Sequence, residues 1–121
     1  MLKVLKAGFY TSIQDKGRYG FASKGVPISG VMDAYSADLA NGIVNNSFDA
    51  AVLEITFGGC KLEFLAPTSI SITGGDFSPK INNKPAQLNK RIYVNKGAIL
   101  SFGKVNYGVR CYLAVQGGFQ S

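Results

Sequence analysis

Histidine and tryptophan are absent from this chain of 121 residues, and cysteine occurs only twice, at Cys60 and Cys111. Without histidine, and without a Cys-x-x-Cys spacing, a zinc site is all but excluded. A nucleophile activated by histidine is excluded as well, so any general base would be a carboxylate or a lysine. Each cysteine lies within an apolar run, which favours two reduced thiols in the core over a disulfide.

Long hydrophobic runs are also lacking. No segment approaches the roughly 20 apolar residues that a membrane-spanning helix needs. The opening sequence MLKVLKAGFY lacks the apolar centre of a signal peptide. By default, the sequence therefore predicts a soluble cytoplasmic protein.

Runs of like charge are missing too, although the chain carries 13 basic and 7 acidic residues and a formal net charge of +6. This excess favours anionic partners, with a non-specific surface charge as the alternative. The aromatic and basic residues do not follow the pattern of an RNA-binding sheet. The glycine doublets match neither G-x-G-x-x-G nor a Walker motif, so no nucleotide site is indicated by motif.

Glycine, by contrast, is abundant, with 15 residues, and 46% of the chain is hydrophobic. This composition is typical of one globular domain with many tight turns. Residues 2–13 predict two short strands with a bend at Gly8, and alternation of apolar residues continues beyond residue 50. A hairpin is expected around Asn82-Asn83, and two further strands on either side of residues 95–97. The expected inward residues are Leu53, Ile55 and Phe57; Cys60, Leu62 and Phe64; Ile70 and Ile72; and Val109, Cys111, Leu113 and Val115. At least eight short strands predict a mainly β fold, either a barrel or a sandwich.

One helix is expected, near residues 33–45. Asp33 is a suitable N-cap, and Tyr35, Leu39 and Ile43 recur at helical spacing, which places them on one apolar face of the helix. Asn45 and Asn46 would end the helix in a left-handed turn. The segment before it, residues 14–30, has neither a strand nor a helix period and predicts an ordered glycine-rich loop.

Four carboxylates stand out as candidates for chemistry. Asp15 lies three residues before Arg18, close enough for a salt bridge or for paired contacts to a ligand. Glu54 falls within an apolar strand, where an unpaired charge would be costly. Asp76 follows Gly74-Gly75, where a ligand could approach the backbone closely. Each has a structural alternative: Asp15 and Arg18 could tie the loop together, Asp33 could only cap the helix, and Asp76 could only stabilise a turn.

The stretch TSIQDKGRYGFASKGVPISGVMDAYSADLANGIVNN (residues 11–46) closely resembles the N-terminal signature of the allophanate hydrolase subunit 2 family. This family is also known as the biotin-dependent carboxyltransferase or KipA-like family and includes the C-type subunits of 5-oxoprolinase. Later segments, LEITFGG, ITGGDF, ILSFG and YLAVQGGF, are similar to further blocks of the family, although the family's usual TGAD reads TGGD here. The chain is about half as long as family members or shorter. Residues 1–121 are thus expected to be the N-terminal part of this domain, from a longer chain in which a composite site would be complete.

The resemblance implies a cyclophilin-like β-barrel and a KipI-like partner (subunit 1, or the B-type subunit of 5-oxoprolinase), with an A-type subunit in some complexes. It implies a hydrolase or carboxyltransferase acting on a small amide such as 5-oxoproline or urea. ATP or biotin would act through the full complex, since no motif for a cofactor is present. No nucleic acid, membrane or metal is expected as a partner.

The resemblance also suggests roles for individual residues at a subunit junction. Arg18 would pair with a substrate carboxylate or phosphate, beside Gln14 and Asp15. Ser29 and Gly30 would offer hydroxyl and N–H donors near the helix start. The expected catalytic residues are Asp15, Arg18, Asp33 and Glu54, and the expected substrate-binding residues are Gln14, Ser29, Gly30, Gly74 and Asp76. The alternative is a docking loop in a non-catalytic regulator that binds a KipI-like inhibitor of a histidine kinase.

Overall fold

In a computed structural model, the structure describes residues 2–6, 10–14, 28–29, 33–56 and 59–118. Within these residues strands are the main regular structure, together with one helix, α1 (Ala34–Ile43). The mainly β fold with a single helix near residues 33–45 is confirmed. No helix in this part of the chain has the length and apolar character that crossing a bilayer requires.

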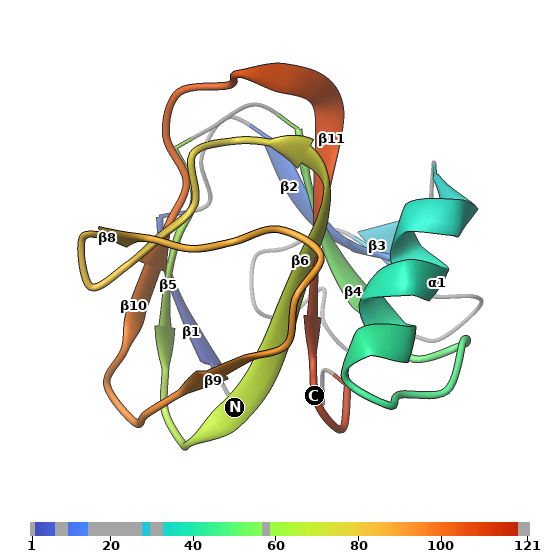
Figure 1. The fold of residues 1–121 in the computed structure, drawn as a ribbon, viewed down its shortest axis with the longest axis horizontal. Helices are drawn as coiled ribbons and strands as arrows, with labels where there is room; N and C mark the ends of the chain where they lie inside the picture. Colours follow the sequence, from blue (N-terminus) through green and yellow to red (C-terminus); the bar gives the residue numbers. More distant parts are fainter. Residues whose placement is uncertain (1, 7–9, 15–27, 30–32, 57–58, 119–121) are drawn as a thin grey trace.

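The strands form two sheets (Figure 1). The first sheet has the order β1-β5-β10-β7-β8, and its strands are β1 (Leu2–Lys6), β5 (Lys61–Phe64), β10 (Ile99–Ser101), β7 (Lys80–Ile81) and β8 (Lys84–Pro85). The second has the order β3-β2-β4-β11-β6-β9, and its strands are β3 (Ile28–Ser29), β2 (Tyr10–Gln14), β4 (Val52–Thr56), β11 (Tyr107–Val115), β6 (Thr68–Asp76) and β9 (Ile92–Val94). Pairing is antiparallel except between β2 and β3. Over the described ranges, the strands do not close into one barrel.

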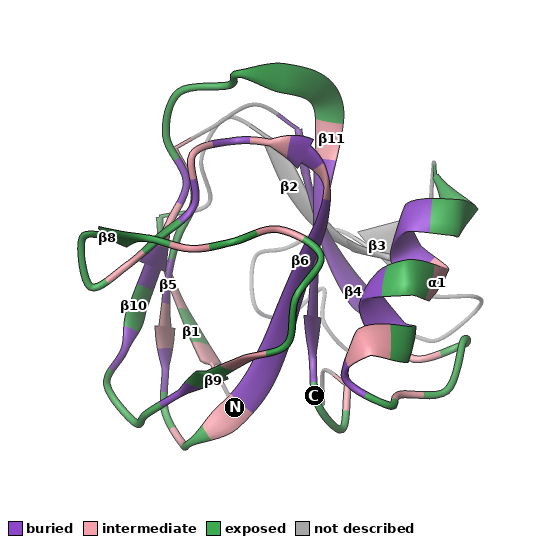
Figure 2. Ribbon diagram, in the orientation of Figure 1, coloured by how far each residue is buried: buried purple, intermediate pink, exposed green. Residues whose placement is uncertain are grey.

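The main core lies between the two sheets. It contains the residues expected to point inward from β5 and β6, together with Leu53, Ile55, Cys111, Leu113 and Val115. Both cysteines are buried in it, as predicted. The other face of β4 and β11 carries Val52, Tyr112 and Ala114, which pack against α1 in a second, smaller cluster. The second sheet is therefore covered on both faces where α1 lies over it (Figure 2).

The apolar face of the predicted helix is not its buried side, although Ile43 is half-buried and packs against the smaller cluster. Tyr35 is 78% exposed and Leu39 37% exposed, whereas the buried side of α1 consists of Ser36, Ala37, Ala40 and Asn41. Small residues allow the helix to approach the sheet closely enough for side chains of β6 to reach its backbone. Ser71 Oγ donates to the Ala40 carbonyl at 2.6 Å, and Thr73 Oγ1 donates to the Ser36 carbonyl at 2.8 Å. The buried face of α1 is therefore the one whose small residues permit these hydrogen bonds, and not the one with the large apolar side chains.

Two other expectations also need correction. Val109, which the alternation predicts to point inward, is exposed. The pairing of β11 with β6 shifts register between Tyr107 and Cys111, so the alternation of faces does not continue through this irregularity. The predicted loop at 14–30 contains the two-residue strand β3, which runs parallel to β2.

The turn predictions fare better. Asn45 adopts a positive φ of 60° at the end of α1, and Asn82 and Asn83 have φ values of 51° and 68° in the hairpin between β7 and β8. The strands β9 and β10 form on either side of residues 95–97, as expected. They belong to different sheets, however, so this turn passes the chain from one sheet to the other. The predicted bend at Gly8 and the inward position of Phe57 lie outside the described residues.

Candidate functional site

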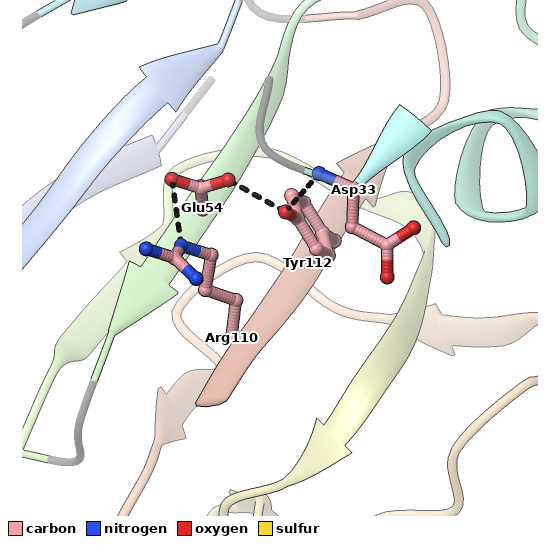
Figure 3. A network of polar contacts seen from close by, with 4 residues as sticks. All are labelled: Asp33, Glu54, Arg110 and Tyr112. Carbon is pink, nitrogen blue, oxygen red and sulfur yellow. Dashed lines mark hydrogen bonds and ion pairs between the residues drawn. The ribbon is translucent and has the colours of Figure 1, made fainter. Parts of the chain in front are cut away.

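A buried polar network links the centre of the second sheet to the start of the helix (Figure 3). Glu54 on β4 and Tyr112 on β11 stand directly opposite each other in the strand register. The Tyr112 hydroxyl donates to Glu54 Oε2 at 2.6 Å and accepts the backbone N–H of Asp33 at 2.9 Å. Burial, together with the bond to Glu54, raises the pKa of Tyr112 well above its ordinary value. Tyr112 therefore remains a phenol and can donate to Glu54 over the whole physiological pH range.

Asp33 caps α1, as predicted. Its Oδ1 accepts the Ser36 N–H at 3.1 Å and its Oδ2 accepts the Ser36 hydroxyl at 2.7 Å. These bonds stabilise the charged form, and the hydroxyl of Ser36 contributes most to lowering the pKa of Asp33 below its ordinary value of 3.8. Asp33 is thus an ionised carboxylate at neutral pH, fixed at the N-terminus of the helix.

Arg110 lies on the same side of β11 as Tyr112, at the outer end of the network. Its Nε is 3.8 Å from Glu54 Oε1, an ion pair too long to be a hydrogen bond. The side chain of Arg110 is 33% exposed, whereas that of Glu54 is 3% exposed. Glu54 thus attracts the Nε side of the guanidinium and leaves its outer side for contact with a ligand.

A pocket of about 380 Å³ opens beside this network. Its lining consists of Asp33 and Ser36 from the helix start, Gly74 and Gly75 from β6, and Tyr107, Gly108, Val109 and Arg110 from β11. It brings a fixed carboxylate and a guanidinium to one hollow, with glycine backbone on the side formed by the sheet.

The glycines are required there because the backbones of β6 and β11 come unusually close. A Cβ on Gly74, which has φ +87°, would lie 2.6 Å from the Arg110 carbonyl oxygen, and one on Gly108 would lie 2.5 Å from Gly75 Cα. Such distances are too short for any side chain. The shape of the pocket therefore depends on these glycines, and Gly74 has a structural role in addition to lining the hollow.

The structure brings together three of the residues selected from the sequence: Asp33 and Glu54 share the network, and Gly74 lines the same pocket as Asp33. Asp76 lies apart from them. Its carboxylate accepts the Ser78 N–H at 3.0 Å and the Asn106 side-chain amide at 3.3 Å, which fits the alternative of a turn. It does not belong to the pocket lining.

The remaining candidates lie towards the other edge of this sheet or outside the described ranges. The backbones of Gln14 and Ser29 are paired with each other, and Gln14 is also paired with Val52, two residues before Glu54 on β4. Asp15, Arg18 and Gly30 lie outside the described residues. Gln14, at the start of the predicted loop, therefore lies on the strand next to β4, which carries Glu54.

Sequence reasoning missed Tyr112, Arg110 and Ser36. A signal was present for the first two, because Arg110 and Tyr112 alternate with the inward-facing Cys111 and Leu113. This alternation assigns them to the opposite face of the strand. What the sequence did not provide was the pairing of β4 with β11, which sets Tyr112 opposite Glu54. Over the same described part of the chain, no cluster of three potential metal ligands is found.

Comparison with known proteins identifies relatives of the whole chain. Residues 24–121 match the family model described as carboxyltransferase domain, subdomain A and B. The chain is 47% identical over 117 residues to urea amidolyase of Lachancea kluyveri, covering 96% of this chain and 6% of that protein. It is 35% identical over 118 residues to the C-type subunit of 5-oxoprolinase from Escherichia coli, covering 98% of this chain and 38% of that protein.

Solved structures agree with these matches. The crystal structure of K. lactis urea amidolyase superposes with a TM-score of 0.83 at 46% identity, covering 97% of this chain and 7% of the larger one. The family resemblance inferred from residues 11–46 and from the later blocks is therefore confirmed. The chain spans well under half the length of the relatives named here.

Proposed function

We propose that this chain, which belongs to the family of the carboxyltransferase domain, subdomain A and B, contributes part of an enzyme's active site. The reaction would change the C–N bond of a small amide. The enzyme would be a biotin-dependent carboxyltransferase or a 5-oxoprolinase-type complex. One of its relatives is named as a subunit and another is a far longer urea amidolyase. Both support a role as one part of a larger assembly.

The observation that carries this proposal is that Asp33 and Arg110 both line one pocket. An amide presents N–H donors and an oxygen acceptor. The ionised carboxylate of Asp33 can accept from the N–H groups, and the outer face of the Arg110 guanidinium can donate to a carbonyl or carboxylate oxygen. A volume of about 380 Å³ suits a molecule of the size of urea or 5-oxoproline, with room to spare.

Glu54 and Tyr112 act through these two residues. Glu54 lies beside the Nε of Arg110, and the Tyr112 hydroxyl holds the backbone N–H of Asp33 and with it the first turn of the helix. We propose that Gln14, Asp15, Arg18, Ser29 and Gly30 complete the site from the loop, where Arg18 would supply a second guanidinium. Asp76 would contribute through the turn that it stabilises.

The family resemblance implies two cofactors, ATP and biotin, and the residues of the pocket suit them to different degrees. A nucleotide does not suit the described pocket, because its lining offers a single cation, Arg110, beside the carboxylate of Asp33, which would repel a triphosphate. A single carboxyl group does fit, and biotin would supply one in a carboxyltransferase. Arg110 is the residue that would hold it.

We propose that the partners are a KipI-like subunit, with an A-type subunit in an oxoprolinase complex, and that the complex acts in the cytoplasm. The support for a partner is the subunit name of the bacterial relative.

The test is an assay of the complete protein that carries this chain, mixed with its partner subunits. ATP hydrolysis that depends on 5-oxoproline, and carboxylation that depends on urea, are measured for the wild type and for Arg110→Gln. We expect one of the two activities, and a rise in KM of at least tenfold in the variant, about 1.4 kcal/mol. Lys104→Gln, which removes an exposed charge away from the pocket lining, is the control.

A stable complex with neither activity would contradict the proposal and favour the regulator that binds a KipI-like protein. Turnover that Arg110→Gln leaves unchanged would retain the enzyme but place the substrate elsewhere.

A further inference from the structure

A second hollow, which shares no residue with the pocket described above, lies where the two sheets each end in an open strand. β8 is the last strand of the first sheet and β9 is the last strand of the second. A groove of about 440 Å³ lies between them and the segment that joins them, residues 86–91. In Figure 1 this part is drawn in orange, and β8 lies on the opposite side of the strands from α1.

The groove is basic. Its lining includes Lys84, Lys90 and Arg91, all exposed, and no acidic residue. The excess of positive charge in the groove follows from the order of charges along the sequence. All seven acidic residues occur at or before Asp76, and every charged side chain after it is positive. The apolar part of the lining consists of Ile81, Pro85, Ala86, Ile92 and Tyr93. A lining that combines apolar side chains with three cations is complementary to a segment that alternates apolar and acidic side chains.

The groove is also held in place before any ligand binds. The Ala86 N–H donates to the Pro79 carbonyl at 2.9 Å, and the Asn89 N–H donates to the Ile72 carbonyl at 2.8 Å. Ile81, Ala86, Leu88 and Ile92 pack against the main core. A ligand would therefore meet a surface that is already ordered, which reduces the entropic cost of binding.

The backbone along the groove favours an extended ligand. β9 is paired with β6 on one side, and within the described residues no strand is paired with its other side. An open strand edge presents N–H and C=O groups to a further strand. β9 contains no proline, whereas Pro85 removes an N–H donor from β8. Tyr93, 65% exposed in the middle of β9, offers an aromatic contact to the added strand.

We propose that this groove binds an extended acidic segment of a partner protein, which adds a strand to β9 and places its carboxylates against Lys84, Lys90 and Arg91. The inference rests on the groove alone and is independent of the proposed activity.

The probe is a fluorescein-labelled peptide of alternating valine and glutamate, of about ten residues, the length of a long strand. Fluorescence anisotropy measures its binding to the chain at low and at physiological salt. We expect binding that weakens as salt rises. The triple variant Lys84→Gln/Lys90→Gln/Arg91→Gln is expected to lose at least tenfold in affinity. The matched control is Lys3→Gln/Lys61→Gln/Lys104→Gln, which removes the same charge from exposed sites outside the groove and is expected to bind like the wild type. Unfolding curves in urea verify that both variants remain folded.

Hydrogen exchange provides the second readout. Strand addition is expected to slow exchange of amides in Ile92–Val94, which a loose electrostatic contact would leave unchanged.

Four results would overturn the proposal: equal loss of binding in both triple variants, equal binding of a valine–glutamine peptide, full displacement of the peptide by millimolar inorganic phosphate, or no protection of β9. Binding of anionic phosphatidylserine vesicles in place of the peptide would also overturn it and indicate a membrane surface.

Discussion

Tyr112 and Glu54 face each other across neighbouring strands and share a hydrogen bond of 2.6 Å in a buried position. This pair supports two residues of the pocket lining, because Tyr112 also accepts the Asp33 N–H and Glu54 also faces Arg110. Two buried side chains therefore contact both charged residues of the pocket lining.

Removing the Tyr112 hydroxyl tests this arrangement. Tyr112→Phe leaves the Glu54 carboxylate and the Asp33 N–H each without one partner, and a buried group left unsatisfied costs about 1–3 kcal/mol. We expect a loss of unfolding free energy in that range, measured by urea denaturation. Tyr35→Phe, at an exposed position on α1, is the control and is expected to change stability by less than about 0.5 kcal/mol. Equal effects in the two variants would contradict the role of the network.

The ion pair of Glu54 and Arg110 is expected to be weak in spite of the burial of Glu54. Its atoms are 3.8 Å apart and Arg110 is partly exposed, so water screens the attraction. A double-mutant cycle of Glu54→Gln and Arg110→Gln is expected to yield a coupling free energy below about 1 kcal/mol. The coupling should decrease further at high salt. A coupling several times larger, insensitive to salt, would show that the pair is stronger than its geometry indicates.

Gly108 and Gly97 offer a matched test of close backbone packing. Both have a positive φ, +87° and +88°, but a Cβ on Gly108 would lie 2.5 Å from Gly75 Cα, while Gly97 faces open space. Gly97→Ala carries only the backbone strain, about 1 kcal/mol. Gly108→Ala adds a backbone clash, and we expect its cost to exceed that of Gly97→Ala by at least about 1 kcal/mol. Similar unfolding midpoints for the two variants would contradict the close approach.

The small face of the helix leads to an opposite pair of substitutions. Ala40 is fully buried against the sheet, so Ala40→Leu would force α1 away from β6 and is expected to cost about 1–3 kcal/mol. Leu39→Ala, on the partly exposed side, is expected to cost less than Ala40→Leu. Thermal unfolding of the two variants measures the difference. A larger cost for Leu39→Ala than for Ala40→Leu would indicate that the apolar face of the helix packs against the sheet, contrary to the structure.

The cap at Asp33 predicts a pH dependence. Its pKa is lowered in the folded chain by the bonds from Ser36, so the charged form stabilises the fold above the ordinary pKa of 3.8. This contribution is lost as pH falls through the lowered folded-state value. Asp33→Asn keeps an N-cap without the charge. We expect the wild type to lose stability relative to Asp33→Asn as the pH falls from about 6 to about 2, as measured by urea unfolding. Parallel profiles would contradict the assignment.

How far the sequence determined this fold differs from element to element. Alternation of apolar residues predicted β5 and β6 with their inward residues, and the asparagines predicted two turns. These are local patterns, which the sequence states directly. The buried face of α1 was missed because hydrophobicity was used as the measure of burial. The hydrogen bonds from Ser71 and Thr73 to the helix backbone require small side chains on the face of α1 that meets the sheet.

The site shows the same division. Asp33 and Glu54 could be selected as single residues, one from a capping pattern and one from a charge within an apolar strand. Their connection through Tyr112 depends on strand register between residues 58 positions apart, which no local pattern contains. Asp76 was selected because of the glycines before it, but those glycines accommodate β11 and the carboxylate stabilises a turn.

The position of β11 has a consequence for how this domain acquires its structure. β11 follows every other described strand in the chain and yet stands between β4 and β6 in the second sheet. Until it is synthesised, β2 and β4 on one side and β6 and β9 on the other have no strand to join them. Pairings of such long sequence separation are expected to form slowly. During translation, the open edges of β4 and β6 would be exposed to misassociation, and a chaperone that shields them would raise the yield of folded protein without altering its final stability.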